Sequence, residues 1–114
     1  MPQKRWNISE YRGVWSFVMF DLHVDTQESR RQYTQFRNLL LKLGYDMLQF
    51  SVYARYYPSE EASETHRKKI RQGLPPGGQV RVITVTDRQF GKMDVFHGKK
   101  RANPEKPPEQ MLLF

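Results

Sequence analysis

The sequence predicts an α+β sandwich, built from one β-sheet and the helices that cover it. Runs rich in β-branched and aromatic residues alternate along the chain with stretches in which apolar residues recur at helical spacing. A length of 114 residues, of which 38% are hydrophobic and 13% aromatic, suits a single domain with one core. We therefore expect one compact sheet and its covering helices.

The first predicted element is a central strand over Val14–Asp21, an almost unbroken run of β-branched and aromatic residues. The run stops abruptly at the Asp21 carboxylate. Two interpretations are open, because an aspartate here is either a turn residue that accepts backbone hydrogen bonds or a metal ligand or catalytic carboxylate on a rigid strand. Residues Met1–Arg12 are polar and charged, and we expect a loosely held arm with Gly13 as its hinge.

A helix is predicted next. Asp25 or Thr26 can cap its first turn, where Glu28 interacts favourably with the helix dipole. Gly44 supplies the left-handed stop after Leu43. The apolar residues at helical spacing, which predict the buried stripe, are Tyr33, Phe36, Leu40 and Leu43.

Residues Tyr45–Tyr57 predict a second strand, long and bent, which Pro58 ends. A second helix is expected from Ser59 to about Gln72, acidic in its first turns and basic in its last. Its apolar stripe is thin, so we expect it to cover the sheet lightly at an edge. The stripe consists of Ala62, His66 and Ile70.

The remaining elements follow a turn rich in glycine and proline at residues 73–78. Val80–Thr86 is β-branched throughout and predicts another central strand. Asp87–Met93 predicts a short helical turn or loop, and Asp94–Gly98 a short strand. The order of strands and helices is the split βαβ pattern of ferredoxin-like (βαββαβ) domains, in which the first and third strands lie centrally.

We assign residues 1–98 to this domain and residues 99–114 to a linker and tail. The linker combines basic residues with prolines, which favours a solvated segment. The chain ends on Met111–Phe114, which is apolar throughout. A free apolar tail favours aggregation, so we expect it to pack on its own sheet or along a partner's edge strand, which suggests a homodimer.

The composition favours an anionic partner. There are 19 basic and 12 acidic residues, with a net charge of +7 and a pI near 9.9, and nucleic acid is the leading candidate. The absence of cysteine excludes a disulfide framework and a thiolate metal site. Because no run approaches the roughly 20 apolar residues of a membrane span, we expect a soluble, cytoplasmic protein with no membrane partner.

Dense basic clusters favour contacts with the backbone of duplex DNA, although such runs are also typical of solvated faces. Arg30 and Arg31 lie beside the start of the first helix, and two interpretations are open for them, namely contact with phosphate or simple solvation. His23 is either a second ligand or acid beside Asp21, or an ordinary loop histidine. Phe50 and Tyr53 are interpreted as core or interface residues rather than base-stacking platforms. The clusters comprise Arg67, Lys68, Lys69, Arg71, Lys99, Lys100 and Arg101.

Several short motifs occur in a distinctive order between Val14 and Gly98. The most specific is Gln49–Tyr53 (Gln-Phe-Ser-Val-Tyr), combined with an aspartate at the end of the first strand. Together these motifs resemble the Cas2 family of CRISPR-associated adaptation proteins, especially members that accompany type II systems. The other matching motifs are Met19-Phe20-Asp21, Asp25-Thr26, Gly44-Tyr45 and Thr84-Val85-Thr86 with Phe90.

The resemblance implies a homodimeric ferredoxin-like protein whose two Asp21 carboxylates face each other across the interface. Paired carboxylates raise each other's pKa unless a cation neutralises them, and Mg²⁺ accepts such hard oxygen ligands. The family acts as a scaffold that binds duplex DNA and bridges dimers of the larger adaptation integrase, and some members are metal-dependent nucleases. This chain has Met47 and Leu48 where some members carry an arginine, which favours the scaffold.

Overall fold

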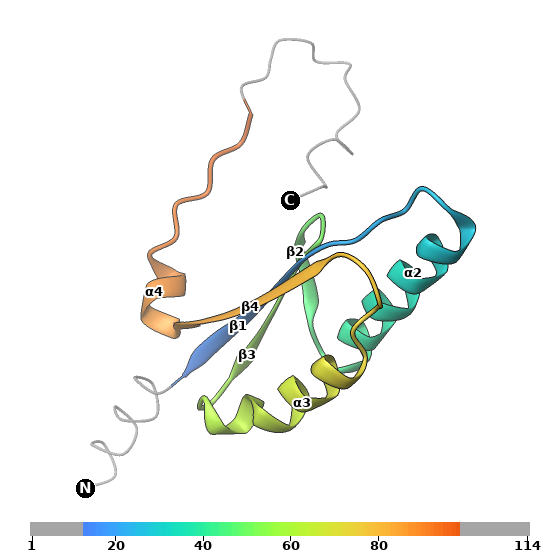
Figure 1. Ribbon diagram of the computed structural model, residues 1–114. Helices are drawn as coiled ribbons and strands as arrows, with labels where there is room; N and C mark the ends of the chain where they lie inside the picture. Colours follow the sequence, from blue (N-terminus) through green and yellow to red (C-terminus); the bar gives the residue numbers. More distant parts are fainter. Residues whose placement is uncertain (1–12, 99–114) are drawn as a thin grey trace, which may run out of the picture.

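The computed structural model describes residues 13–98 and confirms the α+β, ferredoxin-like prediction. Four strands form one sheet in the order β2-β3-β1-β4, with every neighbouring pair antiparallel. The helices α2 and α3 lie on the same face of this sheet (Figure 1). The expectations for residues 1–12 and 99–114 lie outside the described residues. The elements are β1 (Val14–Asp21), α2 (Gln27–Lys42), β2 (Asp46–Gln49), β3 (Val52–Tyr57), η1 (Glu61–Ser63), α3 (Glu64–Gln72), β4 (Gln79–Thr86) and α4 (Asp87–Gly91).

Strand β1 lies in the middle of the sheet, as its sequence predicts. Because side chains alternate along a strand, its residues separate into two sets. Val14, Val18 and Phe20 join the core against the helices, and the buried Ser16 lies on the same face. The opposite set faces the side of the sheet that neither α2 nor α3 covers, which we call the open face. This set consists of Trp15, Phe17, Met19 and Asp21.

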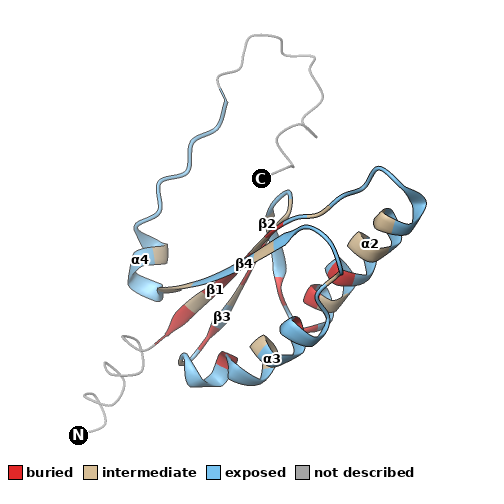
Figure 2. Cartoon of the chain, in the orientation of Figure 1, coloured by how far each residue is buried: buried red, intermediate tan, exposed pale blue. Residues whose placement is uncertain are grey.

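Helix α2 forms as predicted. Thr26 is the N-cap, and its side chain accepts a hydrogen bond from the Ser29 backbone N–H at 3.0 Å. Gly44 follows the helix with φ of +89°, a conformation that favours glycine. Phe36 and Leu40 are buried beneath β1 and β3, and Figure 2 shows buried residues gathered where the helices meet the sheet.

The prediction of one long strand over Tyr45–Tyr57 is wrong. The segment forms the hairpin β2–β3, which reverses at Phe50 and Ser51. Ser51 adopts a left-handed φ of 66°. The reversal has no glycine, asparagine or proline to mark it, and the run of apolar and polar residues continues through it. A two-residue hairpin turn normally contains such residues, which is why the turn escapes prediction.

The central position predicted for Val80–Thr86 is also wrong. The two central strands are β1 and β3, and β4 pairs only with β1, so it is an edge strand of the described sheet. Residues Asp94–Gly98 form no strand. Val95 is 66% exposed and Phe96 is 85% exposed, because no strand of residues 13–98 lies beside them.

Helix α3 ends at Gln72 as predicted, but it begins with the 3₁₀ turn η1. This tighter turn changes which residues face the core. Ser63 is fully buried and Ala62 is exposed, so the predicted role of Ala62 in the buried stripe is wrong. Ile70 is buried as expected. Within the described part of the chain, no helix has the length and apolar character needed to cross a bilayer.

Candidate functional site

Asp21 is the last residue of β1 and its side chain is exposed on the open face. The preceding residue, Phe20, anchors this end of the strand in the core. Its ring lies 5.2 Å from the ring of Phe36 and 5.6 Å from that of Tyr53, measured between centroids. On the other side, Asp21 is paired in register with Gln79 of β4. The carboxylate is therefore carried by rigid, well-packed backbone.

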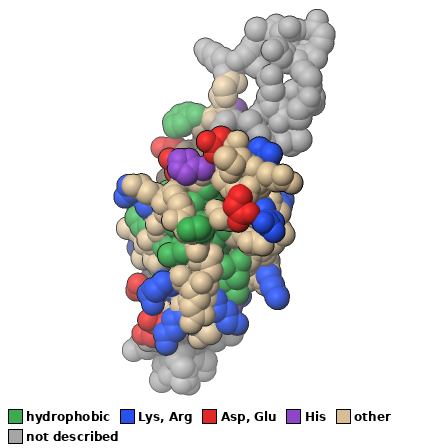
Figure 3. All heavy atoms as spheres, turned by 45° about the vertical axis from the view of Figure 1, so that its right-hand side comes forward, with side chains coloured by type: hydrophobic (Ala, Val, Ile, Leu, Met, Phe, Trp, Pro, Cys, Tyr) green, Lys and Arg blue, Asp and Glu red, His purple; other side chains and the backbone are tan. Residues whose placement is uncertain are grey.

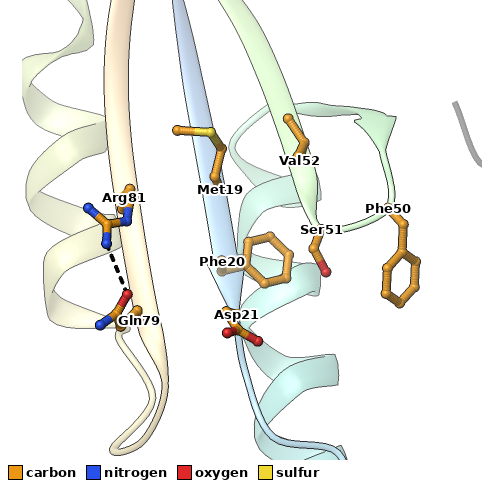
Figure 4. A pocket seen from close by; sticks show the side chains of 8 residues that line it. All are labelled: Met19, Phe20, Asp21, Phe50, Ser51, Val52, Gln79 and Arg81. Atoms are coloured by element: carbon orange, nitrogen blue, oxygen red, sulfur yellow. Dashed lines mark hydrogen bonds between the residues drawn. The ribbon is translucent and has the colours of Figure 1, made fainter.

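A shallow hollow of about 220 Å³ surrounds Asp21 on the open face (Figure 4). It combines a carboxylate, a guanidinium, an amide and a hydroxyl with an exposed phenylalanine ring. Figure 4 shows these groups coming from three places, namely the end of β1, the start of β4 and the β2–β3 turn. The lining residues are Met19, Phe20, Asp21, Phe50, Ser51, Val52, Gln79 and Arg81.

The β2–β3 turn forms one wall of the hollow. The Ser51 carbonyl accepts a hydrogen bond from the Phe20 N–H at 3.1 Å, and the Ser51 and Tyr33 hydroxyls lie 3.4 Å apart. The left-handed φ of Ser51 costs about 1–2 kcal/mol for a residue with a Cβ. Phe50 is 65% exposed and is therefore not a core residue of this chain. Tyr53 is 1% exposed and is a core residue.

Gly78 brings the loop before β4 close to Asp21. A Cβ at this position would lie 2.5 Å from the Asp21 carbonyl oxygen and 2.6 Å from Cδ2 of Leu22. Gly78 also has a φ of +79°. Only glycine fits both the backbone conformation and the close approach. The loop therefore fixes the end of β1 from the side opposite the β2–β3 turn.

Arg81 and Gln79 are site residues that the sequence does not reveal. Arg81 lies inside a β-branched run that predicts a buried strand, yet its side chain is exposed and lines the hollow. Its register partner on β1 is Met19, two residues before Asp21. The alternation of strand residues could have indicated that position 81 shares a face with position 21, given the correct register.

The hollow supplies one carboxylate of the kind that Mg²⁺ binds. Mg²⁺ takes oxygen ligands and retains several waters, so one or two carboxylates can hold it. Between residues 13 and 98, however, no three His, Cys, Asp or Glu side chains are grouped to hold a metal. Of the described residues, only Asp21 contributes a carboxylate to the lining of the hollow. His23 is not among the lining residues and instead lies against a smaller hollow with Leu22 and Gly77.

The predicted basic residues lie on the helices, on the opposite side of the sheet from Asp21. Each of the two helices carries four basic residues and one acidic residue. Figure 3 shows Lys and Arg side chains on both sides of a central hydrophobic strip. The basic residues of α2 are Arg30, Arg31, Arg37 and Lys42, and those of α3 are Arg67, Lys68, Lys69 and Arg71. Lys99, Lys100 and Arg101 lie outside the described residues.

Four of these cations have internal partners. Arg30 donates to the Val24 carbonyl at 3.3 Å. Arg31 forms an ion pair with Glu28, whose pKa is lowered by the hydrogen bond from Arg31. Arg67 donates to the Ser63 hydroxyl at 2.9 Å and to Glu64 at 3.0 Å. Arg37 donates to the Tyr53 hydroxyl at 3.0 Å. The residues of α3 best placed to meet a partner are therefore the exposed Lys68, Lys69 and Arg71.

The fold and the hollow define a small ferredoxin-like protein with a single carboxylate at the end of its first strand. The family model described as CRISPR associated protein Cas2 matches residues 14–93. The chain therefore belongs to the Cas2 family, as its motifs indicate.

Curated relatives agree with this assignment, and each is named CRISPR-associated endoribonuclease Cas2. The protein of Flavobacterium psychrophilum is 43% identical over 107 residues, which cover 94% of this chain and 93% of the relative. That of Parvibaculum lavamentivorans is 44% identical over 101 residues, covering 89% of this chain and 100% of the relative. That of Paracidovorax avenae is 42% identical over 107 residues, covering 94% and 99% respectively.

Proposed function

We propose that this Cas2 protein acts as a homodimeric scaffold in CRISPR spacer acquisition, binding duplex DNA and bridging dimers of the adaptation integrase. The observation that carries this proposal is the separation of two surfaces. Away from the polar groups of the Asp21 hollow, the open face of the sheet is largely apolar, whereas eight basic residues lie on the helices behind it. A dimer formed through the open faces would leave both helical layers outward for DNA.

The open face has the character of a subunit interface. Ile83 is 50% exposed and Tyr56 is 41% exposed, on either side of Phe17 and Trp15 of β1. A contiguous exposed apolar surface is uncommon in monomers and typically binds another protein. A second copy of this chain is the occupant that also completes the Asp21 site, because it contributes a second carboxylate.

The outward helices would supply the DNA contacts. Lys68 and Lys69 are consecutive, exposed and at the basic end of α3. Neutralising phosphates with such residues releases counterions, so the affinity for duplex DNA should fall steeply with salt.

Metal-dependent cleavage of RNA or DNA through the Asp21 pair is the second candidate function. It is favoured by the position of Asp21 in an accessible hollow and by the name of the relatives, endoribonuclease. In a dimer the two Asp21 carboxylates would hold Mg²⁺, which when bound activates a water and stabilises charge on the scissile phosphate. Arg81 would orient that phosphate from β4.

Substitution of Asp21 separates the two candidates. For the scaffold we expect Asp21→Ala and Asp21→Asn to leave duplex binding and assembly with the integrase unchanged, measured by gel shift and size-exclusion chromatography. The same variants should abolish any Mg²⁺-stimulated cleavage. Failure of either variant to assemble, while it remains folded by circular dichroism, would contradict the scaffold.

The DNA surface is tested by neutralising two of its lysines. Lys68→Gln/Lys69→Gln should weaken duplex binding and reduce the slope of log affinity against log salt by about 2. The control Arg88→Gln/Lys92→Gln also removes two positive charges, one on α4 and one at the residue that follows it. Equal losses in both double variants would show that only net charge matters, and would refute a footprint on α3.

A further inference from the structure

Strand β2 leaves one edge of the sheet open. It pairs only with β3 among the described strands, so the backbone N–H and C=O groups on its outer side have none of these strands beside them. An edge of this kind can bind an extended segment, which adds a strand to the sheet. Because β2 has four residues and a bulge between Met47 and Gln49, the edge suits a short segment and not a long strand.

Arg37 lies beside this edge with the end of its guanidinium available. Its Nε atom donates to the Tyr53 hydroxyl at 3.0 Å, and Tyr53 is the register partner of Met47 in β2. Within the described residues no partner is found for its two Nη atoms, and the ion pairs there are formed by other arginines. A guanidinium held in this way can donate two hydrogen bonds to one carboxylate.

Exposed apolar side chains lie next to Arg37. Leu41 is about one helical turn further along α2 and is 41% exposed, and Met47 is 47% exposed. The Ser51 and Tyr33 hydroxyls lie 3.4 Å apart, so the chain runs back beside α2 through β2 in the opposite direction. We call Arg37, Leu41 and Met47, together with the open edge of β2, the β2 strip.

The last residues of the chain have a complementary pattern. Glu109, Met111 and Leu113 alternate with other residues, so in an extended strand all three would lie on one face. Residues two apart in a strand are separated by about 6.6 Å, and residues four apart in a helix, such as Arg37 and Leu41, by about 6 Å along its axis. Glu109 can therefore meet Arg37 while Met111 meets Leu41.

The tail is long enough to reach the sheet of a neighbouring subunit. Figure 1 shows residues 92–98 running away from their own sheet, and Phe96 is 85% exposed. The ten residues between Gly98 and Glu109 extend to at most about 35 Å. This reach exceeds the width of four paired strands, which is roughly 15 Å.

We propose that the tail of one copy of this chain adds a strand to the β2 strip of a second copy. Residues 109–114 would run antiparallel to β2, because β2 runs opposite to α2, with Glu109 bound to Arg37 and Met111 packed on Leu41. The inference rests on the proposed homodimer, and it assigns the tail to a surface outside the open face.

Charge reversals in the full-length chain test this pairing. Arg37→Glu and Glu109→Arg should each weaken the homodimer about tenfold or more in analytical ultracentrifugation, because both contacts in the dimer become like-charge pairs. The two reversals combined in one chain should restore the native affinity within about twofold. An equimolar mixture of the single variants should also associate with near-native affinity, since each heterodimer contains one native and one reversed pair. Rescue in the double variant without rescue in the mixture would place the tail on its own sheet and overturn the exchange between copies.

Hydrogen exchange detects the added strand directly. Pairing should protect the outward amides of residues 46–49 in the native protein, and each single reversal should speed their exchange about tenfold. The controls are Lys42→Glu, on another face of α2, and Glu105→Arg, elsewhere in the tail, and neither should change dimerisation or this exchange. A monomeric native chain would refute the proposed homodimer and the exchange with it. A native dimer that both reversals leave unchanged, or equal losses in the controls, would overturn only the tail contact.

Discussion

Replacing Gly78 by alanine should destabilise the domain and displace the end of β1. Two independent effects add at this position. The first is conformational, because φ is +79° and the left-handed region costs a residue with a Cβ about 1–2 kcal/mol. The second is steric, because the new Cβ would lie 2.5 Å from the Asp21 carbonyl oxygen, which is backbone and cannot rotate away.

The combined loss should be about 2–4 kcal/mol of the free energy of unfolding, after the small gain from restricting the unfolded chain. For a domain of this size such a loss lowers Tm by roughly 10–15 °C. Because Gly78 precedes Gln79, the register partner of Asp21, we also expect weaker pairing between β1 and β4 at the hollow.

Thermal and urea unfolding of Gly78→Ala measure this loss, with Gly77→Ala as the control. Gly77 has an ordinary φ, and a Cβ there would meet only the His23 ring at 3.7 Å. The control should therefore change stability by less than about 1 kcal/mol. Similar stability of the two variants would refute the tight approach of this loop to Asp21.

Three further predictions concern pH, dimerisation and the tail. Burial, then the charges of Arg55 and Lys69, lower the pKa of His66, whose Nδ1 lies 2.9 Å from the Arg55 guanidinium and from the Tyr57 hydroxyl. Because the unfolded state binds the proton more readily, the free energy of unfolding should be constant above about pH 6.5 and decrease as the pH falls below it. Urea titrations at several pH values should show a weaker pH dependence for His66→Asn than for the native protein. The same pH dependence in both proteins would contradict the assignment. Ile83→Arg on the open face should weaken dimerisation at least tenfold in analytical ultracentrifugation. The control Leu74→Arg, at a residue after α3 that is 45% exposed, should leave dimerisation unchanged. Equal effects of the two variants would exclude the open face as the interface. Deleting Met111–Phe114 should weaken dimerisation or partner binding, and unchanged assembly would refute the proposed packing of the tail.

The elements that the sequence predicts well are those with strong local signals. Helix α2 has a threonine cap, a buried stripe at helical spacing and a glycine stop, and each of these signals acts on residues near it in the sequence. Strand β1 is recognisable because it is apolar on both faces. Asp21 is noticeable for the same reason, since a carboxylate that ends an apolar run requires an explanation.

The parts that escape prediction depend on contacts between distant residues. The reversal at Phe50 and Ser51 is enforced by the hydrogen bond from Phe20, some 30 residues earlier in the chain, and not by turn-forming residues. Strand β4 is apolar like a central strand although it is an edge strand of the described sheet. An apolar face that binds a second subunit, as proposed for the open face, would have the same sequence pattern as a face buried within a subunit, so pattern alone cannot distinguish them.

The arrangement of charges bears on how the two proposed nucleic-acid contacts relate. Lys68 and Lys69 lie on α3, and Asp21 with Arg81 lies on the far side of a continuous sheet. A duplex along the helices therefore cannot also place its backbone at Asp21 of the same subunit without leaving the helical face. Binding on the helices and binding in the hollow should then be separable by mutation. Lys68→Gln/Lys69→Gln should weaken only duplex binding, and Asp21→Asn should abolish only cleavage, because the sheet keeps the two surfaces apart.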